Sequence, residues 1–441
     1  MDYTRRIRRL QYLPCAFHFD SPDGIPMDLK ALRVVRQAFP KKSGALFPNL
    51  LQLEFIQPSH AEPCLDIFLE SKSISLSLHW SEETTPIGQL FSTIKKYALH
   101  LEELDLGSFK DQGAVESADL SKLTCKMQDL RGLACGCRKL TYPALLHLMN
   151  LPRLRKLQVP NTSEDILASI ELSTDSRRSI FPALQHLTIR VDGLAPFATL
   201  FKRMRPLELQ SLTLYLTQAP PPAELHLALL ALGTESGTTS SIREVTFKYT
   251  LPQPSGRRII NPHESGIHPN IITGHTLEPL LACRNLELLH LDIACTFDLG
   301  DTQMNAMAVA WPRLRHIQLG AHRGWGSPPQ VTLHGILALL GGCRELEYLA
   351  LSFDATCEPP PISSISPKCI NHKITYIYVG DAPLDQGSIN RVGDFLQRIL
   401  PNLTGIGGNW LYTTFATETR QREWGDLIYK FRSLKDCRVI L

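Results

Sequence analysis

The sequence lacks the long hydrophobic run, of about 18 or more residues, that a membrane-spanning helix needs. Its first nine residues, Met-Asp-Tyr-Thr-Arg-Arg-Ile-Arg-Arg, are charged. No apolar stretch with a small-residue cleavage site follows them, so they do not resemble a secretory signal. We therefore expect a cytoplasmic or nuclear protein that does not act at a membrane.

The sequence also lacks an excess of either charge. It contains 46 Lys and Arg residues against 43 Asp and Glu residues, which gives a formal net charge of +3. Proteins that bind nucleic acid or anionic membranes through their surface potential usually carry a strong basic bias. The composition therefore predicts neither of these partners.

The 11 cysteines are dispersed and contain no Cys-x-x-Cys pair. An odd number of scattered cysteines without a secretory signal is typical of reduced thiols, and we expect most of them to be buried.

Signatures of catalysis are absent as well. The sequence has no phosphate-binding P-loop, no G-x-G-x-x-G, no G-x-S-x-G and no H-E-x-x-H motif. The densest group of possible metal ligands is His263, Glu264 and His268, with His275 just beyond. These residues fall in or beside a Pro/Gly/Asn-rich segment, for which a surface loop or a partner-binding loop is the favoured interpretation. We expect no enzymatic activity, no metal and no cofactor.

The sequence does contain an internal repeat, in which an apolar residue is followed by others three and five positions later. From Leu50 to Leu434 the copies recur on average about every 30 residues, a spacing close to that of leucine-rich repeats. Clear copies begin at Leu50, Leu101, Leu154, Leu184, Leu209, Ile242, Leu286, Leu314, Leu346 and Ile374, and weaker ones at Ile7, Ser73, Leu130, Leu403 and Leu434.

Amphipathic helical patterns lie between the copies. A helix is predicted from Asp301, as the capping residue, with Met304, Met307 and Ala308 on one buried face. Others are predicted from Thr332 and over residues 394–400. Cysteines such as Cys283 and Cys343, which precede a copy, are expected to seal the end of a helix against the strand layer.

Alternation of strand and helix at this period predicts an α/β fold, a leucine-rich-repeat solenoid shaped as a horseshoe. The parallel β-sheet forms its concave face and the helices its convex face. We expect one array over residues 1–441, with an atypical repeat or cap at 1–40, a long inter-repeat loop at 251–272 and capping repeats at 401–441. The central leucines should be buried, among them Leu53, Leu104, Leu157, Leu187, Leu289 and Leu349.

The repeats resemble those of leucine-rich-repeat substrate receptors of cullin–RING (SCF) ubiquitin ligases, in particular basidiomycete F-box proteins. The resemblance is carried by the Cys-Arg-x-Leu-x-x-Leu-x-Leu copies beginning at Cys283 and Cys343, by Tyr3-Thr-Arg-Arg-Ile-Arg-Arg-Leu, and by Asp301 to Leu314 with its Ala-Trp-Pro-Arg-Leu. It covers nearly the whole chain. It implies a protein that recognises a substrate for ubiquitin ligation.

The family's F-box, a helical segment that opens with Leu-Pro-x-Glu and docks a Skp-type adaptor, is not found. Repeat residues begin at Ile7, and Leu13-Pro14-Cys15-Ala16 does not match that motif. We therefore expect adaptor binding only if an F-box lies upstream. A repeat-only relative, a free-standing scaffold or inhibitor, and a GTPase-regulating repeat protein remain alternatives.

A partner-binding strip is predicted on the concave face, because residues beside the buried apolar ones point to the opposite side of a strand. Tyrosines gather in the C-terminal third, which we expect to be the anchor, although tyrosine also suits exposed strand positions by propensity alone. Trp325, in a predicted loop, is expected to extend the strip. The candidate residues are Arg190, Lys248, His290, His316, Gln318, Tyr348, Tyr376 and Tyr378.

Overall fold

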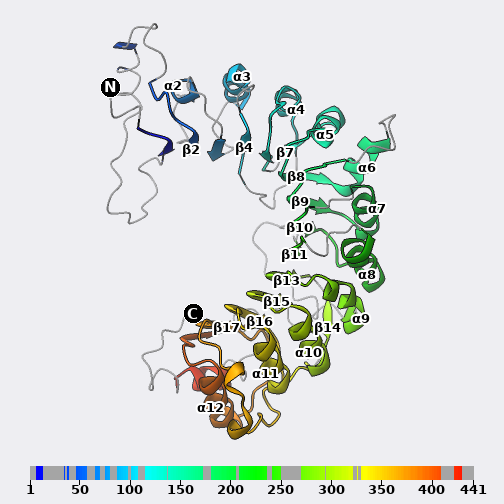
Figure 1. Cartoon of the computed structure of the whole chain (residues 1–441), viewed down its shortest axis with the longest axis vertical. Coiled ribbons are helices and arrows are strands. Elements are labelled where there is room, and N and C mark those ends of the chain that lie inside the picture. The colour runs from blue at the N-terminus through cyan, green and yellow to red at the C-terminus, as the bar shows by residue number, and fades with distance from the viewer. Residues whose placement is uncertain are drawn as a thin grey trace. The chain divides into compact units, whose positions relative to one another are not determined.

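The computed structural model describes residues 6–12, 34, 37–38, 46–56, 65–69, 75–79, 87–97, 101–107, 115–136, 138–171, 180–204, 208–235, 241–249, 270–293, 295–320, 325, 329–408 and 422–429. The chain contains two compact units, Met1–Ile189 and Arg190–Leu441. Each unit alternates strands of a parallel sheet with helices, and the helices lie on one side of that sheet (Figure 1).

Fourteen described strands make up the main sheet, and their order across the sheet follows their order in the chain. In the first unit these are β1 (Arg9–Tyr12), β2 (Gln52–Ile56), β3 (Ser75–His79), β4 (Glu103–Asp105), β6 (Gly132–Ala134) and β8 (Lys156–Thr162). Strand β9 (His186–Val191) contains the residues at which the first unit ends and the second begins. In the second unit they are β10 (Ser211–Leu216), β11 (Glu244–Tyr249), β13 (Leu288–Asp292), β15 (His316–Leu319), β16 (Tyr348–Leu351), β17 (Tyr376–Tyr378) and β18 (Gly405–Gly407).

Each of these strands begins two residues after the first residue of one predicted repeat copy. For example, β2 follows Leu50 and β18 follows Leu403. The copy at Leu434 lies outside the described residues, as does most of the predicted cap at 1–40. The predicted α/β leucine-rich-repeat fold with a parallel sheet is therefore confirmed.

Two short parallel pairs lie outside the main sheet. They join β5 (Val115–Glu116) to β7 (Arg138–Lys139), and β12 (Ile271–Thr273) to β14 (Thr296–Asp298). The second pair corrects the predicted loop 251–272, because Ile272 is a fully buried strand residue in register with Phe297. Residues 251–269 of that loop lie outside the described residues.

Helices follow the strands in both units. In the first unit they are α2 (Leu65–Leu69), α3 (Ile87–Tyr97), α4 (Ala118–Thr124), α5 (Tyr142–Met149) and α6 (Ser163–Glu171). In the second they are α7 (Leu194–Met204), α8 (Pro222–Leu230) with a π-helical turn at Ala231–Glu235, α9 (Gly274–Leu277) with a 3-10 turn at Glu278–Ala282, α10 (Asp301–Ala310), α11 (Leu333–Gly342) and α12 (Ile389–Ile399), and residues 422–429 are helical too. Two further 3-10 turns cover Ile362–Ser364 and Pro367–Cys369.

Local capping agrees with the sequence at one helix and departs from it at another. Thr332 caps α11, and its hydroxyl accepts a hydrogen bond from the His334 backbone N–H. Helix α10 is capped by Gly300 and not by the predicted Asp301. The Asp301 carboxylate instead accepts two hydrogen bonds of 2.7 Å from the backbone N–H and hydroxyl of Thr332, in the next repeat.

The core is a continuous apolar layer between strands and helices within each unit. The six central leucines named above are all at most 3% exposed, as predicted. Helix α10 buries Met304, Met307 and Ala308 on one face, also as predicted. Since each repeat packs against its sequence neighbours alone, the contacts between adjacent repeats add to the stability of each unit.

The described cysteines form no disulfide. Cys135, Cys283, Cys295 and Cys343 are buried, whereas Cys125 and Cys369 are half-buried and Cys357 is exposed. Burial raises the pKa of the Cys283, Cys295 and Cys343 thiols to about 12, so these thiols stay protonated at neutral pH. Such groups pack the core and are poor nucleophiles.

Asn371 links two repeats beneath the sheet. The side chain is 4% exposed, and its Nδ2 donates to the Leu346 carbonyl at 2.8 Å. Its Oδ1 accepts from the backbone N–H groups of Lys373 and Ile374 at 2.8 and 2.9 Å. One buried amide therefore satisfies three backbone groups at the start of β17.

We predict that Asn371→Ala lowers the free energy of unfolding by about 1–3 kcal/mol, because it leaves buried backbone groups without partners. Urea denaturation followed by circular dichroism measures this change. Asn402→Ala is the control, since Asn402 is exposed and its side-chain amide donates a hydrogen bond to the His372 carbonyl. Its expected cost is below about 0.5 kcal/mol. Equal losses in the two variants would contradict the assigned role.

Candidate partner-binding face

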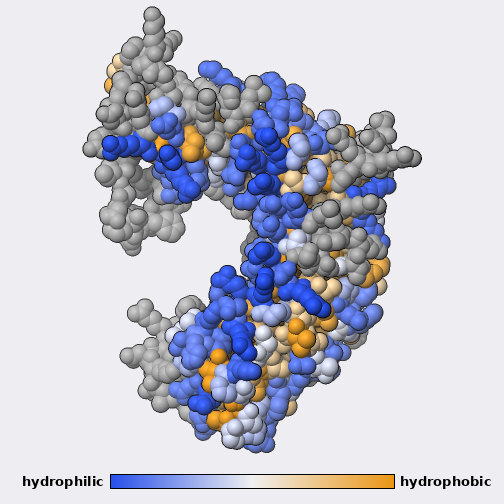
Figure 2. Space-filling view, viewed as in Figure 1, coloured by the Kyte–Doolittle hydropathy of each residue, from blue (hydrophilic) through white to orange (hydrophobic). Residues whose placement is uncertain are grey.

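We call the sheet surface that points away from the helices in the second unit the open face. Strand β13 shows how the sequence builds it. Leu289 and Leu291 are fully buried, whereas Leu288, His290 and Asp292 alternate with them and are half-buried. Since side chains alternate along a strand, the polar residues are carried to the open face. In Figure 2, hydrophilic residues gather over the region of β13 to β17 in this unit.

Strand register aligns the open-face residues in rows. Neighbouring strands are about 4.8 Å apart, so each row is a ladder of adjacent side chains. One row crosses five strands and contains Thr246, His290, Gln318, Ala350 and Tyr378. A second contains Leu288, His316 and Tyr348.

Aromatic side chains gather at one end of these rows. The rings of His316 and Tyr348 lie 6.4 Å apart between centroids, with their planes tilted by 35°. Tyr376 and Tyr378 follow on the next strand. We call Tyr348, Tyr376 and Tyr378 the tyrosine cluster.

The phenols of this cluster are partly shielded from solvent. Burial raises the pKa of Tyr348 above its usual value, and the charges of Tyr376 and Asp292 raise it further. Burial also raises the pKa of Tyr376. Both phenols are therefore neutral at physiological pH and can donate hydrogen bonds.

Glycines shape the outer side of the cluster. Strand β18 pairs Gly405 with Tyr376 and Gly407 with Tyr378. A Cβ atom at Gly407 would collide with the Tyr376 hydroxyl and would lie 3.0 Å from Cδ2 of Tyr378. The two rings therefore lie close against the glycine strand. Rings held in this way lose little conformational entropy when they bind a partner.

The open face is uneven in depth. Gln318 is only 7% exposed and Ala350 is fully buried, although both occupy open-face positions. They form a floor between His290 and Tyr378, which are half-buried in the same row. Gln318, a predicted contact residue, therefore offers less surface than its neighbours. Neither this floor nor the glycines of β18 were predicted from the sequence. The repeat spacing nevertheless gives the positions of these residues on their strands.

The structure brings most predicted contact residues together. Lys248 lies on β11 in register with Asp292 on β13. Arg190 lies on β9, separated from β11 by β10, so it is apart from the tyrosine cluster. Strands β11 to β17 carry the remaining candidates in succession, namely Lys248, His290, His316, Gln318, Tyr348, Tyr376 and Tyr378.

Trp325 does not extend the open face, so that prediction is wrong. Its side chain is fully buried, and its Nε1 donates to the Leu319 carbonyl at 2.9 Å. Its ring lies 5.6 Å from that of Phe297. Large aromatic rings gain more from burial than from a surface position, provided that the N–H finds an acceptor.

Neither a metal centre nor a membrane-spanning helix is found in the described part of the chain. His275 lies 3.1 Å from the Glu278 carboxylate and stacks on His226 at 4.6 Å between ring centroids. The other residues of the metal alternative, His263, Glu264 and His268, lie outside the described residues.

No protein-family model and no curated protein matches the sequence. Among solved structures, the chain is similar to one in the crystal structure of a complex of Rad7 and Elc1 from yeast. The two are 15% identical with a TM-score of 0.44, and the match covers 81% of this chain and 83% of that one. This similarity is too low to transfer a function or a partner.

Proposed function

We propose that the protein is a non-catalytic binding module that holds a protein partner on its open face, with the tyrosine cluster as the anchor. The observation that carries this proposal is the close packing of Tyr376 and Tyr378 against Gly407, beside the partly shielded Tyr348. Rigid, half-buried aromatic side chains with a polar end are the type that dominates the energy of protein interfaces.

The more specific proposal is that the module recognises substrates for a cullin–RING (SCF) ubiquitin ligase, or is a repeat-only relative of such receptors, in the cytoplasm or nucleus. The resemblance of the Cys-Arg-x-Leu repeats at Cys283 and Cys343 supports it. A free-standing inhibitor is less favoured, because a strip matched to one basic enzyme would be strongly acidic. The described open face instead mixes Lys248 and His290 with Asp292.

The test begins by identifying the partner with a pull-down and mass spectrometry. Its affinity for Tyr348→Ala/Tyr376→Ala is then measured by isothermal titration calorimetry. We expect binding to weaken by roughly 2–4 kcal/mol, or about 30- to 1000-fold, because both anchors are removed. The thermal midpoint should change little. Ligase subunits recovered in the same pull-down would support the more specific proposal.

Tyr142→Ala is the matched control, because Tyr142 is a 44% exposed tyrosine on helix α5 of the first unit and is not part of the open face. It should bind like the unaltered protein. Normal binding by the double variant would place the anchor elsewhere. An early thermal transition of the double variant would show that these tyrosines mainly support the fold.

A further inference from the structure

The residue directly before each strand occupies an equivalent position in every repeat, which we call the pre-strand position. Its backbone is hydrogen-bonded to the same position in the preceding repeat. Arg155 N–H donates to the Arg131 carbonyl at 2.7 Å, and Gln185 N–H donates to the Arg155 carbonyl at 2.8 Å. Side chains at these positions are therefore neighbours in a row that crosses the sheet at the end where the strands begin.

Three arginines at the pre-strand position each face a carboxylate from the neighbouring repeat. In the first unit, Arg131 Nε lies 3.1 Å from Glu102. In the second unit, Arg243 pairs with Glu287 at 2.8 Å. Arg315 binds Glu347 through its Nε and one terminal nitrogen, at 2.8–3.1 Å. Acidic and basic side chains therefore alternate at successive pre-strand positions, in Glu102 and Arg131 and again from Arg243 to Glu347.

Arg155 breaks the alternation. Its neighbours at the pre-strand position are Arg131 and Gln185, neither of which is acidic. Among the described residues, its exposed guanidinium makes no ion pair or hydrogen bond. The carboxylate that accompanies Arg131, Arg243 and Arg315 has no counterpart here.

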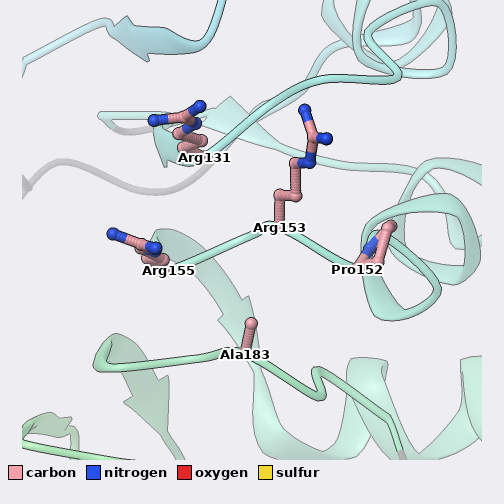
Figure 3. Close-up of a pocket in the computed structure, with 5 residues that line it drawn as sticks. All are labelled: Arg131, Pro152, Arg153, Arg155 and Ala183. Carbon is pink, nitrogen blue, oxygen red and sulfur yellow. The ribbon is translucent and has the colours of Figure 1, made fainter.

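A pocket of about 320 Å³ opens at this break. It is lined by Arg131, Pro152, Arg153, Arg155 and Ala183, all within the first unit. Figure 3 shows Arg131 and Arg155 on one side and Pro152 on the other, with Arg153 between them. Pro152 and Ala183 supply an apolar wall against which the methylene groups of a bound side chain can pack.

The charges around the pocket do not balance. Arg131 has Glu102 at 3.1 Å, and Arg153 has Asp129 at the longer distance of 3.6 Å. Three guanidinium groups are thus accompanied by two carboxylates, which leaves one positive charge, centred on Arg155. A guanidinium presents two parallel N–H donors that match the two oxygens of a carboxylate. One added carboxylate would both balance the charge and restore the alternation.

We propose that this pocket binds an aspartate or glutamate side chain from an acidic segment of the protein partner. Arg155 holds the carboxylate, Arg153 and Arg131 add to the positive field, and Pro152 and Ala183 contact the methylene groups. This inference rests on the proposed function in one respect, that the ligand is a protein. It assigns the partner an acidic segment and gives the protein a second contact site in its first unit.

The test uses the full chain and a fluorescein-labelled hexaglutamate peptide, with binding followed by fluorescence anisotropy at low salt. Arg155→Gln should raise the Kd at least about tenfold, because it removes a charge-assisted hydrogen-bonding group. Gln185→Glu should have a similar effect, because it places the missing carboxylate beside Arg155 while every arginine remains. Binding should weaken as salt is added.

Arg243→Gln is the matched control, since Arg243 occupies the same pre-strand position but already has Glu287. It should bind the peptide like the unaltered chain, as should Tyr348→Ala/Tyr376→Ala. The two sites can therefore fail independently. Unchanged binding by both Arg155→Gln and Gln185→Glu would overturn the pocket assignment. So would stronger competition by inorganic phosphate than by glutarate, which would indicate a phosphate site.

Discussion

Leu349→Ala is expected to lower the free energy of unfolding by roughly 2–5 kcal/mol, because it opens a cavity in a closely packed layer. Leu349 is 3% exposed and lies on β16. Ile317 on β15 and Ile377 on β17 flank it in register. Both neighbours are fixed by the backbone pairing of the sheet, so the layer can close only partly around the lost methyl groups.

Urea denaturation of Leu349→Ala beside Tyr348→Ala provides the measurement. Tyr348 is the adjacent residue on the same strand and points to the opposite side of the sheet. Its truncation removes cross-strand contacts worth about 0.2–1 kcal/mol. The expected difference between the two variants comes entirely from the face on which each side chain lies. A loss of stability in Tyr348→Ala as large as that in Leu349→Ala would contradict the assignment of the two faces.

The strands could be predicted because the spacing of apolar residues in each repeat copy determines both where a strand lies in the chain and which of its faces is buried. In one copy, Leu346 lies just before β16, and Leu349 and Leu351 lie within it. The spacing of two between Leu349 and Leu351 places both side chains on the same face of the strand. The same spacing places Tyr348 on the opposite face without further information. Each repeat contains this information within a few residues, so no long-range contact was needed.

Features that depend on contacts between repeats could not be predicted in this way. Asp301 is a residue type that favours helix caps, but Thr332 from the following repeat binds its carboxylate, and Gly300 becomes the cap. Strand β12 is three residues long and is defined by its pairing with β14, so it carries too little periodicity to distinguish it from a loop. Trp325 lies in a loop-like sequence but is fully buried, with its ring 5.6 Å from that of Phe297.

The candidate site was predictable in position but not in depth. Spacing places Gln318 and Tyr378 in one row, yet only the structure shows that Gln318 is 7% exposed. The reason is that exposure depends on the size of the neighbouring side chains in three strands. The pocket beside Arg155 was missed for a different reason. Its signal is the order of charges at one position across successive repeats, which appears only when the repeats are compared with one another.

Trp311→Ala is expected to destabilise the protein by roughly 3–5 kcal/mol, because Trp311 contributes to three successive repeats. Trp311 directly follows helix α10 in the chain, and its indole is fully buried. Its Nε1 donates to the Leu280 carbonyl, 31 residues earlier, at 3.1 Å. Its own carbonyl accepts the Cys343 thiol, 32 residues later, at 3.3 Å. Truncation to alanine removes the ring and also leaves the Leu280 carbonyl without its hydrogen-bond donor.

Trp311→Phe separates these two effects, because phenylalanine retains most of the ring but has no N–H group. Its expected cost is about 1–3 kcal/mol, chiefly from the unsatisfied Leu280 carbonyl. Guanidinium denaturation of both variants, with circular dichroism as the signal, gives the two values. A larger loss for alanine than for phenylalanine would show that the indole volume holds the neighbouring repeats together. Equal losses would instead mean that the hydrogen bond is the main link, and that the helices close over the missing ring.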